Sequence, residues 1–449
     1  MRRTCAERQN GRLGGNYWRL FAANVTSNLG DGIGLVAYPW LASVVTRSGM
    51  LVALIAVVQR LPWLFFTLPA GVITDRVDRR RAMVAIDASR AVLTVALAVG
   101  VLAEQGRLPK SPDLVTGTRT GLYTLILAIT LLLGIAEVLR DNSAQTILPS
   151  VVRPDRLEKA NGRMWSAELT MNAFAGPPLG ALLLGSALSL PIFADAASFA
   201  IAAALVATLP GRYRATASAG SEHAADRPRS SFRADLAEGV RWLWRHPLLR
   251  PMAIVLGLMN LAGMVSTSVL VLFAQEVLHI GPRLFAVIGF GGALGGIAGG
   301  AVASWASTRW GPGTCLAVVL AVLAIAPFMT GLVAVWPVTL AMFGVQATFG
   351  TLWNVITVSL RQALIPDHLL GRVNSVYRFF AWGMMPLGAA LGGVVVLAVT
   401  AIAGRPTALR ATWFVQAAIL AALFVVGRRR LTTARIDAAR AAAAADRDV

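Results

Sequence analysis

Charged residues are scarce in this chain of 449 residues. Asp, Glu, Lys and Arg make up only 14% of it, whereas hydrophobic residues make up 56% and the mean hydropathy is +0.65. An ordinary soluble domain carries about 25% charged residues. A water-soluble chain of this length could not hide so much apolar surface. The composition therefore excludes a soluble protein and predicts a protein whose solvent is the lipid bilayer.

Residues that ligate metals or form disulfides are also few. The chain has two Cys, Cys5 and Cys315, which lie far apart, and four scattered His. Neither set has the spacing of a disulfide framework or a metal site. The phosphate-binding pattern Gly-x-x-x-x-Gly-Lys-[Ser/Thr] is absent as well. We therefore expect no metal, no cofactor, no catalytic residue and no ATP hydrolysis by the chain itself.

Long apolar runs account for most of the sequence. Each is close to the ~20 residues that a helix needs to cross ~30 Å of hydrocarbon. The first run is too long for the apolar part of a signal peptide, so we expect it to stay as the first helix. The pattern predicts an all-α membrane protein with twelve spans, at about 19–46, 50–74, 82–103, 121–140, 162–185, 188–209, 251–275, 284–307, 314–333, 336–360, 374–402 and 407–427.

The basic residues are distributed unevenly between the two sides of these spans. If the N-terminus is inside, the inner segments hold 32 of the 41 Lys and Arg, and the outer loops hold seven. This asymmetry is the positive-inside rule. It accounts for the net charge of +19 without a nucleic-acid partner, which we do not expect. The distribution predicts a multi-pass protein of the cell (cytoplasmic) membrane with both termini in the cytoplasm.

The order of the spans predicts two halves joined by a polar segment. Residues 217–226 are typical of a flexible linker, and the stretch from Ser231 to Pro247 places Phe232, Leu236, Val240, Leu243 and Trp244 on one helical face, as in a helix lying on a membrane surface. A merely solvated helix is the alternative. The predicted parts are an N-terminal tail (1–18), a six-helix bundle (19–209), the linker with its amphipathic helix (210–250), a second six-helix bundle (251–427) and a C-terminal tail (428–449).

Two short patterns recur in the same order in both halves. Pro-Asp-x-Leu begins at Pro154 and the related Pro-Asp-His-Leu at Pro366. Pro-Leu-Gly-Ala begins at Pro178 and again at Pro386. Each match is short, but the shared order indicates a parallel six-plus-six repeat. Many secondary transporters are built in this way, with the substrate site where the repeats meet.

The loop after the second run carries the most informative motif, Gly71-Val-Ile-Thr-Asp75-Arg76-Val-Asp78-Arg79-Arg80-Arg81. Charges beside a membrane could serve topology alone. However, the run resembles the loop 2–3 signature of the major facilitator superfamily, Gly-x-x-x-Asp-Arg-x-Gly-Arg-Arg, and departs from it at Asp78. The resemblance implies an inner gate formed by Gly71, Asp75, Arg76, Arg79 and Arg80, with Arg140 and Asp141 on span 4 as partners of the loop.

Span 5 contains Gly176-Pro177-Pro178-Leu179-Gly180-Ala181. Proline permits a bend in a membrane helix, and glycine permits close contact with a neighbour. A packing kink is the plain explanation. The segment also resembles the Gly-Pro-x-x-Gly-Gly motif of antiporters in the same superfamily, which favours export over uptake. The family architecture implies that Gly176, Pro177 and Gly180 form a bend at a moving seam, with Gly388 and Gly392 on span 11 and a glycine run from Gly289 to Gly300 on span 8.

Other short patterns are similar to those of the branch that includes enterobactin exporters and macrolide efflux proteins. They include Asn16-Tyr-Trp-Arg, Leu61-Pro-Trp-Leu, Pro366-Asp-x-x-x-Gly371-Arg-Val and Arg241-Trp-Leu-Trp-Arg-His-Pro, and the resemblance runs from about residue 16 to 427. It implies the major facilitator fold and a proton-driven antiporter, working as a monomer, that exports a small amphipathic molecule. A siderophore and a drug-like compound both remain open as the substrate.

Ionisable residues inside the bilayer are costly and are therefore candidates for function. Asp31 in span 1 and Arg60 in span 2 lie near the predicted midplane, and Glu137 lies in span 4. We interpret these three residues as a proton-coupling set in the substrate cavity; a structural ion pair is the alternative. Asp87 with Arg90, Glu168 and Asp195 lie nearer to the predicted span ends, where a structural role is favoured because long side chains reach water.

Three other functions compete with the antiporter. A membrane-embedded transferase for lipid-linked substrates needs acids or His gathered in a long outer loop, yet residues 104–120 offer only Glu104 and Asp113. A sensor needs an added soluble domain, which the sequence does not indicate. A passive or uptake carrier remains possible on sequence grounds alone.

Overall fold

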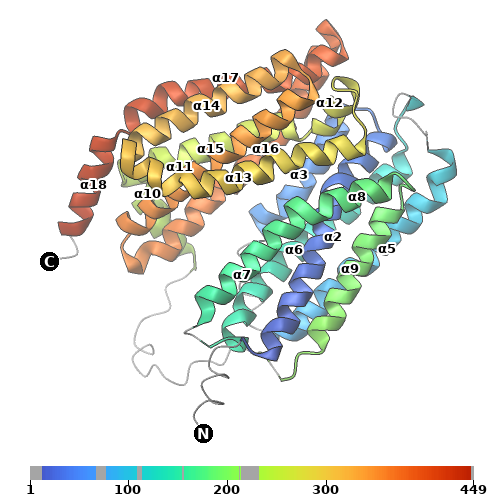
Figure 1. The fold of residues 1–449 in the computed structure, drawn as a ribbon, viewed down its shortest axis with the longest axis horizontal. Coiled ribbons are helices and arrows are strands. Elements are labelled where there is room, and N and C mark those ends of the chain that lie inside the picture. The colour runs from blue at the N-terminus through green and yellow to red at the C-terminus, as the bar shows by residue number, and fades with distance from the viewer. Residues whose placement is uncertain are drawn as a thin grey trace. The chain divides into compact units, whose positions relative to one another are not determined.

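The computed structural model describes residues 13–66, 77–108, 114–153, 156–211, 213 and 232–445, and within these ranges the regular structure is helical throughout. Contacts between residues divide the chain into two compact units. The first comprises Met1–Val45, Phe65–Leu114 and Arg119–Ser218, and the second comprises Thr46–Leu64, Val115–Thr118 and Ala219–Val449. Figure 1 labels the helices of both.

The first unit consists of helices from the N-terminal half of the chain. They are α2 (Gly15–Val45), α5 (Arg79–Glu104), η1 (Gln105–Arg107), α6 (Thr120–Val151), α7 (Leu157–Thr170), η4 (Met171–Ala175), α8 (Gly176–Leu184) and α9 (Leu190–Ala207). Helix α7, the π-helical turn η4 and α8 follow one another without a break. The bend that the prolines predict is therefore accompanied by a π-helical turn, a feature often found at functional sites.

The second unit contains α3 and the helices of the C-terminal half. They are α3 (Gly49–Phe65), α10 (Phe232–Arg245), α11 (Leu249–Thr267), α12 (Leu270–Glu276), α13 (Pro282–Trp310), α14 (Pro312–Val333), α15 (Trp336–Leu364), α16 (Asp367–Ala403), α17 (Arg405–Arg430) and α18 (Thr433–Ala445). Helix α10 falls within the predicted linker segment, and its Trp244 ring contacts Phe380 of α16, with ring centroids 5.5 Å apart.

Each of the twelve predicted spans overlaps a described helix or consecutive described helices, and residues 67–74 of the second span lie outside the described residues. Among the described residues, eight helices are long and apolar enough to cross a membrane, judged by length and composition, and Gly49–Phe65 is a shorter apolar helix. The all-α membrane fold class predicted from the apolar runs is confirmed. The count of twelve spans stays a prediction.

Helix α2 lies at the centre of the first unit and packs against α8 and α9, while α5 packs against α6 and α9. Near its start, the buried Tyr17 hydroxyl donates to the Ala160 carbonyl oxygen of α7 over 3.3 Å. Further along, the Asn172 amide donates to Asn28 Oδ1 over 3.3 Å. Residue numbers rise together along both helices, so α2 and the α7–η4–α8 segment run parallel.

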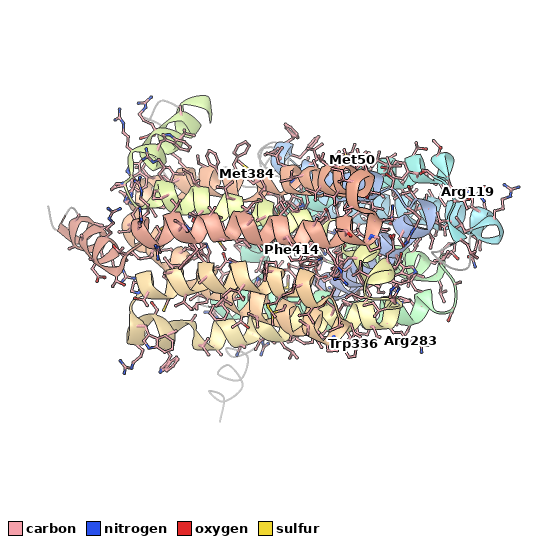
Figure 2. The ribbon with its side chains drawn as sticks, turned by 90° about the horizontal axis from the view of Figure 1, so that it is seen from above. Met50, Arg119, Arg283, Trp336, Met384 and Phe414 are labelled. Atoms are coloured by element: carbon pink, nitrogen blue, oxygen red, sulfur yellow. The ribbon has the colours of Figure 1, made fainter. Side chains whose placement is uncertain are left out.

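Small residues bring α13 and α15 of the second unit into close contact. A Cβ atom built on Gly291, Gly295 or Gly299 would collide with the backbone of α15 near Leu340, Gly344 and Thr348, respectively. The constant offset means that the two helices run parallel, and Figure 2 shows Arg283 and Trp336, near their starts, at the same end. The glycine run of span 8 thus packs inside the unit.

Helix α3 packs with the second unit, although the sequence order places it among the first six spans. The Trp63 and Trp382 rings lie 4.7 Å apart between centroids. A Cβ atom on Gly393 of α16 would lie 2.8 Å from Met50 Sδ. Because α3 is apolar on most of its surface, and Gly393 removes a side chain from α16, the two helices can pack closely.

The two Pro-Leu-Gly-Ala patterns occupy equivalent positions in their units. Gly180 of α8 contacts α2, where an added Cβ would lie 2.7 Å from the Ile33 carbonyl oxygen. Gly388 of α16 contacts α11, where an added Cβ would collide with the Leu261 carbonyl oxygen. Helix α8 therefore meets α2 as α16 meets α11, which supports the parallel repeat. Gly176, one turn before Gly180, contacts α2 at Gly32, and Gly392, one turn after Gly388, contacts α11 at Val265.

We expect Gly180→Ala and Gly388→Ala each to lower the free energy of unfolding by about 1–3 kcal/mol, because the added methyl group meets backbone. The gain in helix propensity, up to about 1 kcal/mol, is smaller. Gly121→Ala is the matched control, since nothing lies within 4 Å of its added Cβ. Thermal unfolding in detergent measures the difference. Equal stability of all three variants would contradict the close helix contact.

Candidate functional site

A chain of charged side chains, most of them buried, runs through the first unit from α2 to α6. Arg90 of α5 is 3% exposed, and its guanidinium donates to Asp31 Oδ1 of α2 over 2.6 Å and to Ser27 Oγ over 3.2 Å. The guanidinium also lies over the Phe199 ring of α9, 3.7 Å from the centroid. Arg90 is thus held on three sides, and Asp31 keeps 35% of its side chain exposed.

Asp87 lies one turn before Arg90 on the same face of α5 and is fully buried. Its Oδ1 is 3.8 Å from Arg90 Nη1 and 3.5 Å from Arg140 Nε of α6. Neither carboxylate oxygen accepts a hydrogen bond from the residues that the structure describes. Asp87 therefore provides a second negative charge within reach of Arg90 and links it to Arg140.

Asp195 of α9 closes the group on another side. The Tyr38 hydroxyl of α2 donates to Asp195 Oδ2 over 2.6 Å, and Asp195 is 2% exposed. A Cβ atom on Gly30 would lie 2.5 Å from Asp195 Oδ1, so the absence of a side chain at Gly30 leaves room for this carboxylate. Three carboxylates and two arginines are gathered inside one helical unit, which is costly unless the charges are paired.

The three residues predicted to couple protons do not all belong to the same unit. Asp31 and Glu137 belong to the first unit, and the negative charge of Glu137 acts on Arg90. Arg60 belongs to α3 in the second unit. The ion pair that Asp31 makes is to Arg90, and a coupling role for Arg60 stays a prediction.

The sequence contained a signal for the missing partners. Asp87, Arg90 and Thr94 are spaced by three and four residues, which places them on one face of a helix. All three are buried. A polar stripe on an otherwise apolar span marks a face turned toward other helices, so the spacing alone could have distinguished this pair from charges at a span end.

The inner-gate motif is described only in part. Gly71, Asp75 and Arg76 lie outside the described residues. Arg79 donates to the Thr146 carbonyl oxygen of α6 over 2.9 Å, and Arg80 donates to the carbonyl oxygen of Ala207, the last residue of α9, over 2.5 Å. Cations are favourable near helix C-termini. The motif arginines therefore bind α6 and α9.

Arg140 and Asp141, the predicted partners of the loop, are next to each other on α6. Arg140 is 5% exposed and pairs with Asp87, while Asp141 is partly buried. Arg140 thus belongs to the charge chain inside the unit. Its predicted pairing with Asp75 stays a prediction.

Asp78 departs from the family pattern and has a structural role. As the N-cap of α5, its Oδ1 accepts the Arg81 backbone N–H over 3.0 Å. Its Oδ2 accepts the Tyr213 backbone N–H over 2.8 Å. Burial acts to raise the pKa of Asp78, but these hydrogen bonds outweigh it and hold the pKa below its ordinary value. Asp78 therefore joins the start of α5 to Tyr213, which follows α9 in the chain.

We expect Asp78→Ala to lower the free energy of unfolding by about 1 kcal/mol at pH 7, since the helix loses its cap. Because the folded-state pKa is depressed, this contribution is present above the unfolded value, about 3.9, and is lost as the pH falls through the folded value. Urea unfolding at pH 7 and pH 3 measures it. Asp78→Asn, which keeps an acceptor, should stay closer to wild type; an equal loss in both variants would contradict the cap.

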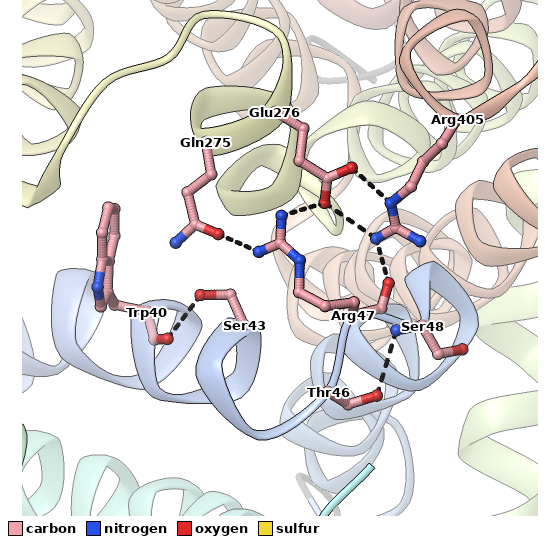
Figure 3. A network of polar contacts seen from close by, with 8 residues as sticks. All are labelled: Trp40, Ser43, Thr46, Arg47, Ser48, Gln275, Glu276 and Arg405. Atoms are coloured by element: carbon pink, nitrogen blue, oxygen red, sulfur yellow. Dashed lines mark hydrogen bonds and ion pairs between the residues drawn. The ribbon is translucent and has the colours of Figure 1, made fainter. Parts of the chain in front are cut away.

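A second polar cluster lies in the second unit, at the start of α3 (Figure 3). Arg47 donates to Glu276 at the end of α12 and to Gln275. Arg405 at the start of α17 also donates to Glu276, with one Nη2–Oε1 distance of 3.0 Å, and to the Arg47 carbonyl oxygen. One carboxylate, 13% exposed, thus holds two arginines, one from the connection between α2 and α3 and one from the start of α17. We call Arg47, Gln275, Glu276 and Arg405 the clasp.

Comparison with known proteins places this geometry in a family. The model of the Major Facilitator Superfamily matches residues 20–385. The multidrug efflux pump Tap of Mycolicibacterium fortuitum is 28% identical over 386 residues, which cover 83% of this chain and 87% of that protein. The Tap pump of Mycobacterium tuberculosis (strain CDC 1551 / Oshkosh) is 26% identical over 408 residues, covering 86% and 88%.

Solved structures agree on the fold at low sequence identity. A variant of the nucleoside transporter NupG superimposes with a TM-score of 0.71 at 11% identity, over 93% of this chain and all of that one. A bacterial homologue of the iron transporter ferroportin in the inward-facing state gives 0.69 at 15% identity, over 92% of this chain and 97% of that one. The family model covers most of the sequence and the architecture matches, so the chain belongs to the Major Facilitator Superfamily.

Proposed function

We propose that this chain is a proton-driven antiporter that exports small amphipathic, drug-like molecules across the cell membrane by alternating access. In this proposal it works as a monomer with both termini in the cytoplasm and performs no covalent catalysis. Membership of the Major Facilitator Superfamily supports a multi-pass membrane protein that transports small molecules. Efflux of drugs is the activity named for the relatives that align with most of the chain, and it supports a drug-like substrate over a siderophore.

The observation that carries the proton coupling is the Asp31–Arg90 pair. A coupling acid must be reachable by water and must change the contacts of its neighbours when it takes up a proton. Asp31 is one-third exposed, and the arginine that it binds is almost fully buried. A proton on Asp31 removes the charge that holds Arg90. Arg90 can then be attracted to Asp87, which is already 3.8 Å away.

The exchange of Arg90 between two carboxylates links protonation to helix packing. Asp31 belongs to α2, and Asp87 belongs to α5 and is also paired with Arg140 of α6. Release of Arg90 from α2 therefore weakens one link between α2 and α5. Weakening this link is a local charge change of the kind that biases a two-state transporter. Glu137 acts on the same arginine and is the second candidate acid.

The clasp and the gate motif are the proposed closures at the two membrane faces. In the proposed orientation, the starts of α3 and α17 lie at the outer face, so the clasp would hold the outer side closed. Arg79 and Arg80, with Gly71, Asp75 and Arg76, would act at the inner face. Breaking the pairs of Glu276 would accompany outward opening.

A facilitator that carries its substrate without protons is the second candidate, because a permanent Asp31–Arg90 bridge would also satisfy the buried charges. A lipid-linked transferase is less well supported, since the aligned relatives are transporters. The decisive difference is whether a proton gradient moves the substrate uphill.

Inverted membrane vesicles that contain the protein test the proposal. Acidification of the vesicle interior should drive accumulation of ethidium, an amphipathic dye, and nigericin, which collapses the pH gradient, should release it. Vesicles from cells without the protein are the control. Ethidium that only equilibrates, with no response to nigericin, would favour the facilitator.

A further inference from the structure

A pocket of about 620 Å³ lies in the first unit between α2 and α7. It has no part in the charge chain described above. Its walls are one face of each helix, because the lining positions recur at helical spacing. The lining residues are Trp18, Phe21 and Val25 of α2, Lys159, Gly162, Arg163, Ser166, Ala167 and Thr170 of α7, and Met171 at the start of η4.

Small side chains on α7 keep the pocket open. Gly162, Ser166 and Ala167 lie along its wall, and a Cβ atom built on Gly162 would meet nothing within 4 Å. The helices nevertheless touch beside the pocket, through the hydrogen bond from Tyr17 to the Ala160 carbonyl oxygen. The hollow is therefore an open groove along two packed, parallel helices.

The two ends of the pocket differ in polarity. Lys159 and Arg163 lie at the end where both helices begin, and the Arg163 guanidinium stacks over the Trp18 ring, 5.6 Å from its centroid. Val25 and Met171 lie further along both helices, at the apolar end. Among the lining residues that the structure describes, none is acidic. The pocket is complementary to a molecule with an anionic head and an apolar body.

We propose that this pocket binds an anionic phospholipid of the inner leaflet. The inference rests on the proposed orientation, in which α2 and α7 both start at the cytoplasmic face. There the two cations are at headgroup level, where basic residues attract anionic lipid. Trp18, 47% exposed, has the amphipathic ring that favours this level. The acyl chain would lie along Phe21, Val25 and Met171.

Native mass spectrometry of the purified full-length chain tests the assignment. The probes are dioleoylphosphatidylglycerol, dioleoylphosphatidylcholine of the same chain length, and glycerol 1-phosphate. We expect one phosphatidylglycerol to stay bound at collision energies that remove phosphatidylcholine. Equal retention of the two lipids would overturn the proposal. Binding of glycerol 1-phosphate as tight as that of the lipid would also overturn it, because the apolar end would then contribute nothing.

Two pocket variants, each with a matched control, locate the site. Lys159→Gln with Arg163→Gln should weaken phosphatidylglycerol binding by about 30-fold, from the loss of two headgroup charges. Arg429→Gln with Arg430→Gln, which removes the same charge at the end of α17, should leave it unchanged. Gly162→Leu should fill the pocket and displace the lipid, whereas Gly121→Leu, also without close neighbours, should not. Binding that survives both pocket variants would contradict the assignment.

This binding measurement does not depend on transport, so failure of the proposed antiport leaves it interpretable. Displacement of the bound phosphatidylglycerol by ethidium at transport concentrations would overturn the lipid assignment, because the pocket would then belong to the substrate path.

Discussion

Asp31→Asn is expected to reduce gradient-driven export to the background of vesicles without protein, while exchange of substrate across the membrane at zero gradient remains. Asparagine keeps the size of the side chain but cannot release a proton or attract Arg90 as a carboxylate does. Arg90 would remain with Asp87, at present 3.8 Å away. Reconstituted vesicles with equal amounts of folded protein allow both activities to be measured.

The same variant distinguishes coupling from a static ion pair. Removing one partner of a buried pair costs about 3–5 kcal/mol because the other charge is stranded. If Asp31 only held the helices together, Asp31→Asn would lower the yield of folded protein, and at equal amounts of folded protein it would change both activities to the same extent. Glu104→Gln, which breaks an exposed pair with Arg107, serves as the control and should change neither. Full gradient-driven export by Asp31→Asn would falsify the coupling role.

Glu276→Gln is expected to lower export about tenfold or more by opening the clasp. The neutral side chain cannot compensate Arg47 and Arg405, which lie 15% and 31% exposed beside it, so their mutual repulsion favours separation of the helix ends. We expect a protein that closes poorly at this face. Impermeant maleimide labelling of a single cysteine at Ser48 should become faster in the variant.

The control for the clasp again comes from a surface pair. Exposed ion pairs contribute about 0–1 kcal/mol, so Glu104→Gln should leave labelling at Ser48 unchanged. Glu276→Asp should restore slow labelling if its shorter carboxylate still reaches both arginines. Labelling of Ser48 at the wild-type rate in Glu276→Gln would show that the cluster does not control this face.

The fold could be predicted from the sequence because apolar runs of span length have few other uses. Element ends were harder to predict. Span 3 was expected to begin at residue 82, but the Asp78 cap starts α5 at Arg79. Asp87 therefore lies eight residues, about 12 Å, into the helix.

The partners of the candidate acid could not be predicted because depth alone does not specify direction. Arg60 and Arg90 both lie inside apolar spans, and only the rotation of α5 and the position of α3 decide which one meets Asp31. Helix α3 packs on α16 through Gly393, a contact between residues far apart in the sequence. The clasp could not be predicted either, because its residues are far apart in the sequence. Arg47, Glu276 and Arg405 also lie at or next to helix ends, where charges often serve topology alone.

The sequence identified glycines that make close helix contacts, but it did not identify the helices that they contact. Gly180 and Gly388 were identified from their repeated context, and both do make close helix contacts. The contacts that the structure shows are with α2 and α11 inside each unit. Their role at a moving seam, with Gly176, Pro177 and Gly392, stays a prediction that the stability and transport of the alanine variants can examine together.

Proton movement coupled to substrate is the most direct test of the account. In vesicles loaded with a pH-sensitive dye, with no pH gradient imposed, an ethidium gradient should drive protons in the opposite direction through the wild-type protein and not through Asp31→Asn. The predicted result is a change in internal pH that requires both substrate and Asp31. Ethidium flux through the wild-type protein with no change in internal pH would contradict the account.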